Sequence, residues 1–152
     1  MKIIQAAVKD AEEILKLQRL AYRSEAELYN DYEISPLKQT INEMLGQFKT
    51  HLFLKAASKG QIIGTVRAYE KDGTCYVRRL AVSPEMQNQG IGTALMKKIE
   101  GCFKAGRFEL FTGAKSAKNI HLYQKLGYSV FRKEQHGCGG SIEIVYMEKF
   151  RK

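Results

Sequence analysis

Two glycines, Gly90 and Gly92, stand in the segment of this 152-residue chain that is best suited to bind a ligand. A strand-like segment, Cys75 to Val82, precedes them, and apolar residues at helical spacing follow. Glycine lets the backbone approach a ligand closely, and the first amides of a helix lack intrahelical partners and carry a partial positive charge. A strand, a glycine turn and a helix in this order therefore predict a phosphate or pyrophosphate site.

The same loop departs from the two best-known nucleotide motifs. A dinucleotide fingerprint requires a third glycine where this chain has Leu95, and the preceding elements read as a hairpin rather than a βαβ unit. No Gly-Lys-Ser/Thr sequence follows the glycines, which excludes a Walker-type loop.

A different family accounts for this segment and for a second one. Gln87-x-x-Gly90-x-Gly92 after Leu80-Ala81-Val82 resembles the acetyl-CoA signature of the GNAT acetyltransferase superfamily. Ser116 to Tyr128 resembles the later motif of that family, an Asn-containing helix that ends in Tyr-x-Lys-Leu-Gly-Tyr. The element order agrees over essentially the whole chain. The resemblance implies a mixed α/β (α+β) fold, with a central mixed sheet flanked by about four helices, as a single domain over residues 1–152.

The resemblance also implies where acetyl-CoA binds. In that family the strand matching Leu80 to Val82 splays from its neighbour, and its free backbone groups pair with the pantetheine amides. The amides of the following loop hold the pyrophosphate. The cofactor-binding residues expected on this basis are Leu80, Ala81, Val82, Gln87, Asn88, Gln89, Gly90, Ile91, Gly92, Thr93, Asn119 and Tyr123.

Tyr123 matches the usual general acid of the family. A tyrosine with a pKa near ~10 can share a proton with a departing thiolate whose thiol titrates near ~8.5. The alternative is that Tyr123 only packs an amphipathic helix. Many members have Asn where this chain has Ser116, and Asn119 stands where a small residue is frequent. Asn119 either hydrogen-bonds the pantetheine arm or is an ordinary polar position.

The general base stays open. Many members carry a Glu just before the Leu-x-Val segment, where this chain has Arg78-Arg79. An ordered water remains a candidate, and so do four carboxylates: Glu25, Glu27, Asp31 and Glu70.

The arginines suggest an anionic acceptor. If the Asp-Gly turn at 72–73 sets the hairpin register, Arg67 lies opposite Arg78. Like charges across a ladder repel, so a carboxylate or phosphate of the acceptor is a possible bridge between them. The alternatives are that both side chains splay into solvent or that they pair with acidic residues such as Glu33.

The resemblance places the acceptor pocket at Tyr22 to Ser35 and Gln135 to Ser141. The first segment is rich in tyrosines and carboxylates, which suit an amine. The second contains Cys138, which we interpret as a bystander thiol because neighbouring His136 is weak support for a nucleophile. The expected substrate-binding residues are Tyr22, Glu25, Tyr29 and Arg78.

Hydrophobic periodicity predicts the elements that must position these residues. Strands are expected at 3–7, 51–57, 61–70, 75–82, 108–112, 128–133 and 142–149. Helices are expected at 14–21, 37–48, 92–104 and 117–126. Asp10 is expected to cap the first helix, and Ser35-Pro36 to begin the second. The terminal strand 142–146 is expected to be exposed, so that it could pair two protomers into a homodimer.

Composition narrows the remaining classes. With 44% hydrophobic and 27% charged residues the chain is neither collagen-like nor largely disordered. No apolar run approaches ~18 residues and the start lacks a signal-like apolar region, so neither a membrane helix nor a secretory signal is expected. The three cysteines, Cys75, Cys102 and Cys138, are widely spaced, which predicts reduced thiols in a cytoplasm and neither a disulfide framework nor a metal site.

The formal net charge of +9 either favours an anionic partner or serves solubility alone, and composition does not choose between them. We interpret the chain as an N-acetyltransferase that moves an acetyl group from acetyl-CoA to a primary amine, on a small molecule or a peptide, by direct attack in a ternary complex. The alternatives are a GNAT-fold sensor that binds acyl-CoA without turnover and a basic nucleic-acid-binding domain. No recognised reader motif supports nucleic-acid binding, and no membrane partner is expected.

Overall fold

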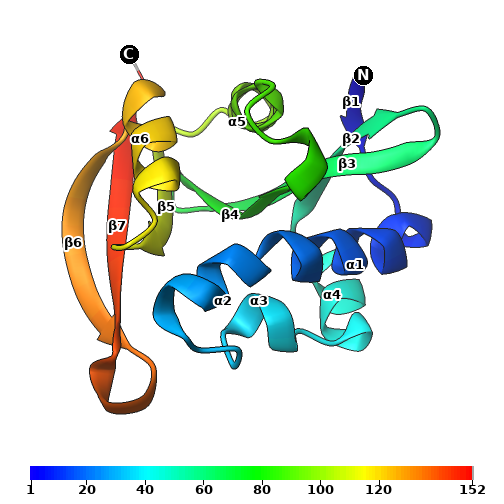
Figure 1. Ribbon diagram of the computed structural model, residues 1–152. Coiled ribbons are helices and arrows are strands. Elements are labelled where there is room, and N and C mark those ends of the chain that lie inside the picture. The colour runs from blue at the N-terminus through cyan, green and yellow to red at the C-terminus, as the bar shows by residue number, and fades with distance from the viewer. Residues whose placement is uncertain (152) are drawn as a thin grey trace.

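The computed structural model describes residues 1–151, except for the side chain of Cys138. Over these residues the strands form one seven-stranded mixed sheet in the order β1-β2-β3-β4-β5-β7-β6 (Figure 1). The strands are β1 (Lys2–Gln5), β2 (Leu52–Ser58), β3 (Gln61–Lys71), β4 (Thr74–Val82), β5 (Arg107–Gly113), β6 (Ser129–His136) and β7 (Ile142–Phe150). The helices are α1 (Ala11–Ala21), α2 (Arg23–Tyr29), α3 (Ser35–Lys38), α4 (Ile41–Gln47), α5 (Ile91–Gly101) and α6 (Ala117–Lys125). Short 3-10 turns are η1 (Val8–Asp10), η2 (Pro84–Met86) and η3 (Cys138–Gly140).

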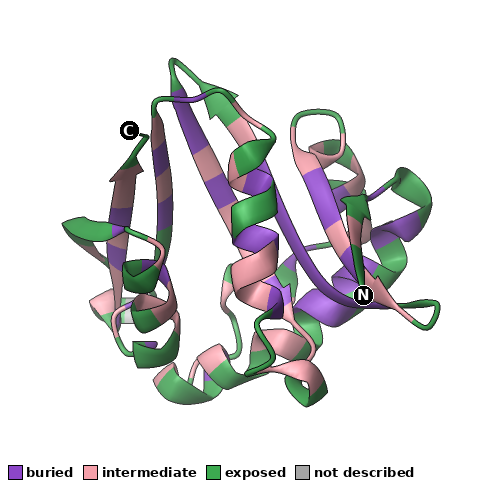
Figure 2. Cartoon of the chain, turned by 90° about the horizontal axis from the view of Figure 1, so that it is seen from above, coloured by how far each residue is buried: buried purple, intermediate pink, exposed green. Residues whose placement is uncertain are grey.

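Helices cover the two faces of the sheet through separate cores. In Figure 1 α1 to α4 lie on one side of the sheet and α5 lies on the other. One core joins α1 and α4 to the sheet through residues such as Ile14, Met44 and Phe53. The other contains Leu95 of α5 and Tyr123 of α6. Buried positions follow the central strands and the inner sides of the helices, as period-2 and period-3.6 patterns require (Figure 2). None of the helices described is long and apolar enough to cross a membrane.

A glycine on β3 sets the distance between α5 and the sheet. A Cβ at Gly64 would lie 2.9 Å from Leu95 Cδ1 and 3.0 Å from Ile91 Cγ2. These distances are too short for ordinary van der Waals contact. Gly64 therefore allows the start of α5 to pack directly against β3.

The two central strands diverge. β4 and β5 are parallel partners only from the pair Thr74–Arg107 to the pair Tyr76–Glu109. β4 then continues to Val82 and β5 to Gly113 without further pairing between them. The predicted splay is confirmed, and the edge of β4 at its C-terminal end has no strand partner on the β5 side.

A β-bulge interrupts β4 just before that free edge. Arg67 pairs with Arg78, as the hairpin register predicted, but the next recorded pair is Thr65 with Ala81. One residue of β3 thus opposes two residues of β4, and Arg79 adopts a φ of 56°. Bulges redirect side chains and commonly occur next to active sites.

The predicted helix over 37–48 is two helices. Thr40 is the N-cap of the second helix. Its hydroxyl accepts a hydrogen bond from the Glu43 amide, and the Glu43 carboxylate accepts one from the Thr40 amide. This capping box begins α4 and leaves α3 as a single turn. Ser35 lies inside α3 and Ile34 is its N-cap, so the predicted Ser35 cap is wrong.

The predicted exposed terminal strand is also wrong. β7 lies between β5 and β6 and pairs with both, so the edge strands of the sheet are β1 and β6. Its inward residues Val145 and Met147 belong to the core beneath α5 and α6, which explains why the strand is interior. A homodimer stays a prediction, without β7 as its pairing edge.

Asp10 occupies the predicted N-cap position of α1, but its carboxylate binds elsewhere. It accepts hydrogen bonds from the Ala7 amide at 2.8 Å and from Lys55 Nζ at 2.9 Å. Burial alone would raise the pKa of Asp10, and these partners outweigh it, so that the pKa lies below its ordinary value.

We expect Asp10→Ala to lower the free energy of unfolding by about 2 kcal/mol at neutral pH, because the partly buried Ala7 amide and the largely buried Lys55 ammonium lose their acceptor. Since the folded pKa is depressed, the contribution is fully present above the ordinary aspartate pKa and is lost as pH falls through the lowered value. Urea unfolding at several pH values measures this. The exposed Glu33–Lys38 pair is the control: Glu33→Ala should change stability by less than about 0.5 kcal/mol. An equal loss for both variants would contradict the assignment.

Candidate active site

Two cavities meet along the free end of β4. The first is a cleft of about 920 Å³ over the start of α5, bounded by β4 and α6. The second, of about 450 Å³, lies between the α2–α3 segment and strands β4, β5 and β7. The residues that line both are Tyr22, Glu25, Leu80 and Asn119. The junction therefore brings together a backbone edge, a carboxylate, a phenol and an amide.

The first cleft ends on the N-terminus of α5. Gly90 is the N-cap residue in a left-handed conformation, with φ 79°, and supplies no side-chain cap. Ile91, Gly92 and Thr93, the first helical residues, line the cleft. Their amides have no intrahelical acceptor and carry the positive end of the dipole. The backbone here fits a pyrophosphate group.

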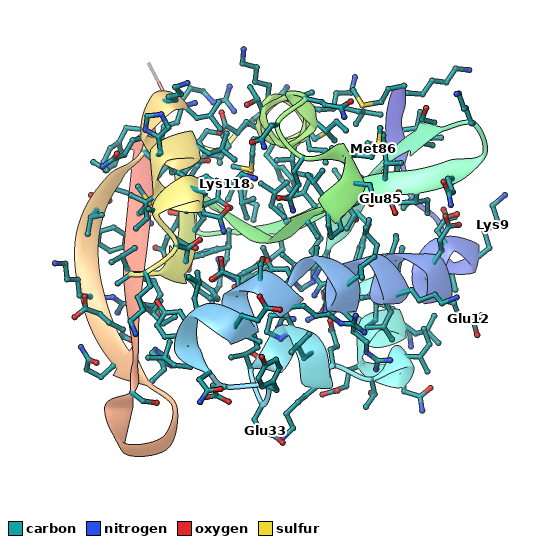
Figure 3. All side chains as sticks on the ribbon, viewed as in Figure 1. Lys9, Glu12, Glu33, Glu85, Met86 and Lys118 are labelled. Atoms are coloured by element: carbon teal, nitrogen blue, oxygen red, sulfur yellow. The ribbon has the colours of Figure 1, made fainter. Side chains whose placement is uncertain are left out.

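Basic and polar side chains flank the same opening. Lys118 Nζ donates to Gln87 Oε1 at 2.8 Å, and Gln87 Nε2 donates to the Val82 carbonyl at 3.3 Å. Figure 3 shows Lys118 on α6 and Met86 on η2, and both line the first cleft. Further cationic or titratable side chains along this wall are Lys115, His121 and Lys125. An anionic ligand would meet a positive rim.

The predicted cofactor-binding residues mostly gather in this cleft. Those that line it are Leu80, Ala81, Val82, Gln87, Asn88, Gly90, Ile91, Gly92, Thr93 and Asn119. Gln89 is exposed and does not line either cavity. Tyr123 lines the second cavity rather than the first.

Glu25 is the carboxylate at the junction. Its Oε1 accepts hydrogen bonds from Ser116 Oγ at 2.6 Å and from Asn119 Nδ2 at 3.4 Å. Burial raises the pKa of Glu25, and the Ser116 hydrogen bond partly opposes this rise. A carboxylate with an elevated pKa, held by neighbours and open to a cavity, can accept a proton.

Tyr123 faces the second cavity from α6. The residue is 6% exposed, and its ring packs edge-on against Tyr128 with centroids 6.1 Å apart. Among the described residues, none hydrogen-bonds its hydroxyl. Burial raises the pKa of Tyr123, and Tyr22 and Glu25 raise it further. The phenol is therefore held in its protonated form, as a proton donor requires.

Two tyrosines, one directly after α1 and one at the end of α2, form hydrogen bonds with β4, with β7 and with the segment after β5. The Tyr22 hydroxyl donates to the Leu80 carbonyl at 3.1 Å. The Tyr29 hydroxyl donates to the Glu143 carbonyl at 3.4 Å and accepts from the Lys115 amide at 2.8 Å. A Cβ at Gly113 would lie 2.5 Å from Tyr29 Oη, so this approach requires glycine. Tyr22 and Tyr29 thus form part of the wall of the second cavity.

The linings of the two cavities distinguish the four carboxylates that were candidates for the general base. Glu25 lines both cavities, Glu27 lines only the first, and Asp31 lines only the second. Glu70 lines neither and pairs with Cys75 at the other end of the hairpin. Only Glu25 of these four lies at the junction.

Both alternatives for the arginine pair are wrong. Arg67 is 2% exposed and donates to Gln39 Oε1 at 2.9 Å, so it does not splay into solvent. Glu33 forms its ion pair with Lys38 at 3.0 Å instead of with an arginine. Arg78 lines the second cavity and lies over the Tyr76 and Phe111 rings, 5.3 and 5.0 Å from their centroids. Arg67 lines neither cavity, so an anion in the cavity does not sit between Arg67 and Arg78.

Two residues of the site were missed from the sequence, and one predicted segment contributes less than expected. Arg79 lines the second cavity, but its orientation depends on the bulge. Ser116 holds Glu25, and the available signal was that serine replaces the usual asparagine at this position. Of the predicted segment 135–141 only His136 and Gly137 line the cavity, and the Cys138 side chain lies outside the described part of the chain.

The chain resembles known acetyltransferases in sequence. The Acetyltransferase (GNAT) family model matches residues 8–128. The N-terminal acetyltransferase B complex catalytic subunit NAA20 of Arabidopsis thaliana is 30% identical over 94 residues, which cover 59% of this chain and 54% of that protein. The chain thus spans about half the length of that curated relative.

Solved structures share the fold. The PaiA N-acetyltransferase of Thermoplasma acidophilum, in complex with coenzyme A, matches with a TM-score of 0.80 at 20% identity, over 99% of this chain and 98% of that one. The ribosomal-protein-S18-alanine N-acetyltransferase of Escherichia coli matches with a TM-score of 0.75 at 16% identity, over 98% and 92% of the two chains. Because the family model covers most of the sequence, this chain belongs to the GNAT family of acetyltransferases, enzymes whose co-substrate is acetyl-CoA.

Proposed function

We propose that this chain transfers an acetyl group from acetyl-CoA to a primary amine by direct attack in a ternary complex. The observation that carries the proposal is the junction of the two cavities at Leu80 and Glu25. One cavity ends on a helix N-terminus suited to phosphate, and the other contains carboxylates and aromatic walls suited to an amine. Two ligands that entered from opposite sides would meet at the free end of β4.

The first cleft supplies the residues that would hold the co-substrate. The amides of Ile91, Gly92 and Thr93 would bind its pyrophosphate, and the free edge of β4 from Leu80 to Val82 would pair with its amide-bearing arm. Asn119, which also lines the second cavity, would contact the arm near the junction. When bound there, acetyl-CoA supplies an acetyl group activated as a thioester.

Glu25 at the junction and Tyr123 in the second cavity would then move two protons. The Glu25 carboxylate accepts a proton from the acceptor nitrogen as that nitrogen attacks the thioester carbonyl. The backbone N–H near Val82 stabilises the negative charge that develops on the carbonyl oxygen. The Tyr123 hydroxyl gives its proton to the departing sulfur, so that the products are an amide and a neutral thiol. Reduced Cys75 and Cys102 fit a reaction in the cytoplasm, and this location stays a prediction.

Calorimetric titration with acetyl-CoA, followed by a screen of primary amines for thiol release, tests the function. Binding that persists at raised salt, together with release that depends on an amine, supports an acetyltransferase. Binding without turnover on any amine class would favour the sensor alternative. Salt-sensitive binding of duplex DNA, with no binding of acetyl-CoA, would overturn the proposal.

A charge placed on the first turn of α5 tests the phosphate site separately. We expect Thr93→Glu to weaken acetyl-CoA binding by more than about tenfold, because a carboxylate there competes for the same amides and repels the pyrophosphate. The same substitution should leave helix stability unchanged or improved, since acidic residues suit a helix N-terminus.

Thr93→Gln is the matched uncharged control for size. It should bind acetyl-CoA within about threefold of the original chain. Calorimetry on both variants, with thermal unfolding in parallel, measures the two effects. Equal weakening by glutamate and glutamine would contradict a phosphate at this helix terminus.

A further inference from the structure

The bulge in β4 turns two consecutive arginines toward one cavity. Successive side chains of a regular strand point to opposite faces of the sheet. At the bulge this alternation fails, and Arg78 and Arg79 both line the second cavity. Arg79 holds a φ of 56°, a region that side-chain-bearing residues rarely adopt and that is commonly maintained at functional sites.

The Arg79 guanidinium has unused hydrogen-bonding capacity. Its Nη1 is buried and has no hydrogen-bond partner among the described residues. Arg67 lines neither cavity and belongs to a separate buried cluster, in which its Nη2 donates to Gln39 Oε1 while its Nε and the acceptor Gln18 Oε1 have no partner. Buried polar groups in proteins are nearly always paired, so the unpartnered Nη1 of Arg79, which lines the cavity, points to a missing acceptor.

No carboxylate of the described chain neutralises this region. None of the ion pairs found within residues 1–151 includes Arg67, Arg78 or Arg79. Burial, together with the charge of Arg79, lowers the pKa of Arg67 to about 9. The charge of Glu43 raises the pKa of Arg79, but the Glu43 carboxylate accepts the hydrogen bond of the capping box at Thr40. An anion in the cavity would relieve an otherwise uncompensated positive charge.

The lining of the same cavity also contains carboxylates. Glu25 lies at the junction, and Asp31 lines the cavity from the segment after α2. Arg79 directly precedes Leu80, which marks the junction in the chain. A ligand in this cavity can therefore meet Glu25 with its amine and the two arginines with an anionic group.

We infer that the acceptor is a small amine that also carries a carboxylate or a phosphate a few bonds from its nitrogen, with the anionic group bound by Arg79 and Arg78. The guanidinium fork of arginine matches both anions in bidentate geometry. This inference rests on the proposed function, because it specifies the substrate class of the same site. The inferred substrate class includes amino acids and amino-phosphates. It does not include polyamines or other amines that lack an anionic group.

Matched pairs of acceptors test the anionic group. The pairs are L-tyrosine with tyramine, L-leucine with isoamylamine, and phosphoethanolamine with ethanolamine; the first two report a carboxylate and the third a phosphate. The value of kcat/KM for each compound is measured by thiol release. We expect the member that carries the carboxylate or phosphate (the anionic member) to exceed the member that lacks it by about tenfold or more in at least one pair.

Two substitutions at Arg79 keep the bulge while removing the charge. Arg79→Asn and Arg79→Gly both accept the left-handed conformation. We expect each substitution to lower kcat/KM for the preferred anionic member by about 10- to 100-fold. The value of kcat/KM for the paired amine without the anionic group should stay within about threefold. Arg23→Gln removes an exposed charge from α2 outside both cavities and should leave every acceptor unchanged.

Calorimetric titration of the same compounds into the protein–CoA complex separates the two proposals. Binding of an anionic member that Arg79→Asn weakens supports the substrate class even where no acetyl transfer follows, and in that case the proposed function fails alone. Transfer to amines without preference for the anionic member in any pair overturns the inference and leaves the function intact. Equal losses on both members of a pair assign Arg79 a structural role and overturn it, and so does the absence of both transfer and binding.

Discussion

Tyr123→Phe is expected to lower kcat by about 100-fold or more at saturating acetyl-CoA and amine, because it removes the hydroxyl that protonates the departing sulfur. The substitution deletes one oxygen whose position shows no hydrogen-bond partner among the described residues, so stability should change by less than about 1 kcal/mol. Since burial raises the pKa of Tyr123, the original chain should show no loss of activity from ionisation of this phenol in the neutral to mildly alkaline range. Thiol release under saturating conditions measures kcat.

A second buried tyrosine provides the matched control. Tyr128 packs against Tyr123, but its hydroxyl donates to Glu100 Oε2 at 2.7 Å. Tyr128 lines neither cavity. Tyr128→Phe should therefore lower stability by about 1–3 kcal/mol while kcat stays within about threefold. A Tyr123→Phe enzyme with unchanged kcat would remove Tyr123 from the proton transfer and return it to helix packing.

Glu25→Gln is expected to lower kcat/KM for amines by about 100-fold at neutral pH, because glutamine keeps the shape and most hydrogen bonds of Glu25 but cannot accept a proton. The loss should shrink as pH approaches the pKa of the amine itself, where more of the acceptor is already neutral. Thiol release across a pH series measures this convergence. Glu12→Gln, on an exposed face of α1 and outside both cavities, is the matched carboxyl-to-amide control (Figure 3).

The pH profile gives the same prediction a second readout. Burial raises the pKa of Glu25, so the original chain should lose activity as pH falls through that raised value, above the ordinary glutamate range. The Ser116 hydrogen bond opposes the rise, and Ser116→Ala should therefore move the acidic limb to still higher pH. Protonation of the amine lowers the activity of both proteins, so the distinguishing feature is the additional loss at the raised pKa of Glu25; if this additional loss persists in Glu25→Gln, the titration belongs to another group.

The order of the elements could be predicted from local patterns. Apolar alternation and helical spacing placed the strands and the two long helices α1 and α5 near their observed bounds, since each pattern reports which face of an element is buried. The Asp-Gly turn fixed the hairpin register, and Arg67 does lie opposite Arg78. The break between α3 and α4 was also readable, because Thr40 and Glu43 have capping-box spacing, but the apolar residues on either side suggested one continuous helix.

The place of β7 and the acceptor cavity depended on contacts between distant segments. A strand pattern does not say which neighbours it will have, and β7 became interior only because β5 and β6 both pair with it. Glu25 was one of four candidate carboxylates until α2 was brought against Ser116, which lies 91 positions away in the chain. Such pairings depend on how helices and strands pack, and local residue types do not encode them.

The sequence by itself determined the candidate phosphate loop and the candidate proton donor, and both roles stay predictions; a glycine turn before a helix and a tyrosine within a local motif are features of neighbouring residues. Only the tertiary structure decided which carboxylate lies at the junction and that Arg79 faces the acceptor cavity. The physical reason is that the extra residue of the bulge reverses the alternation of side chains along β4, and the divergence of β4 from β5 opens the space that those side chains line.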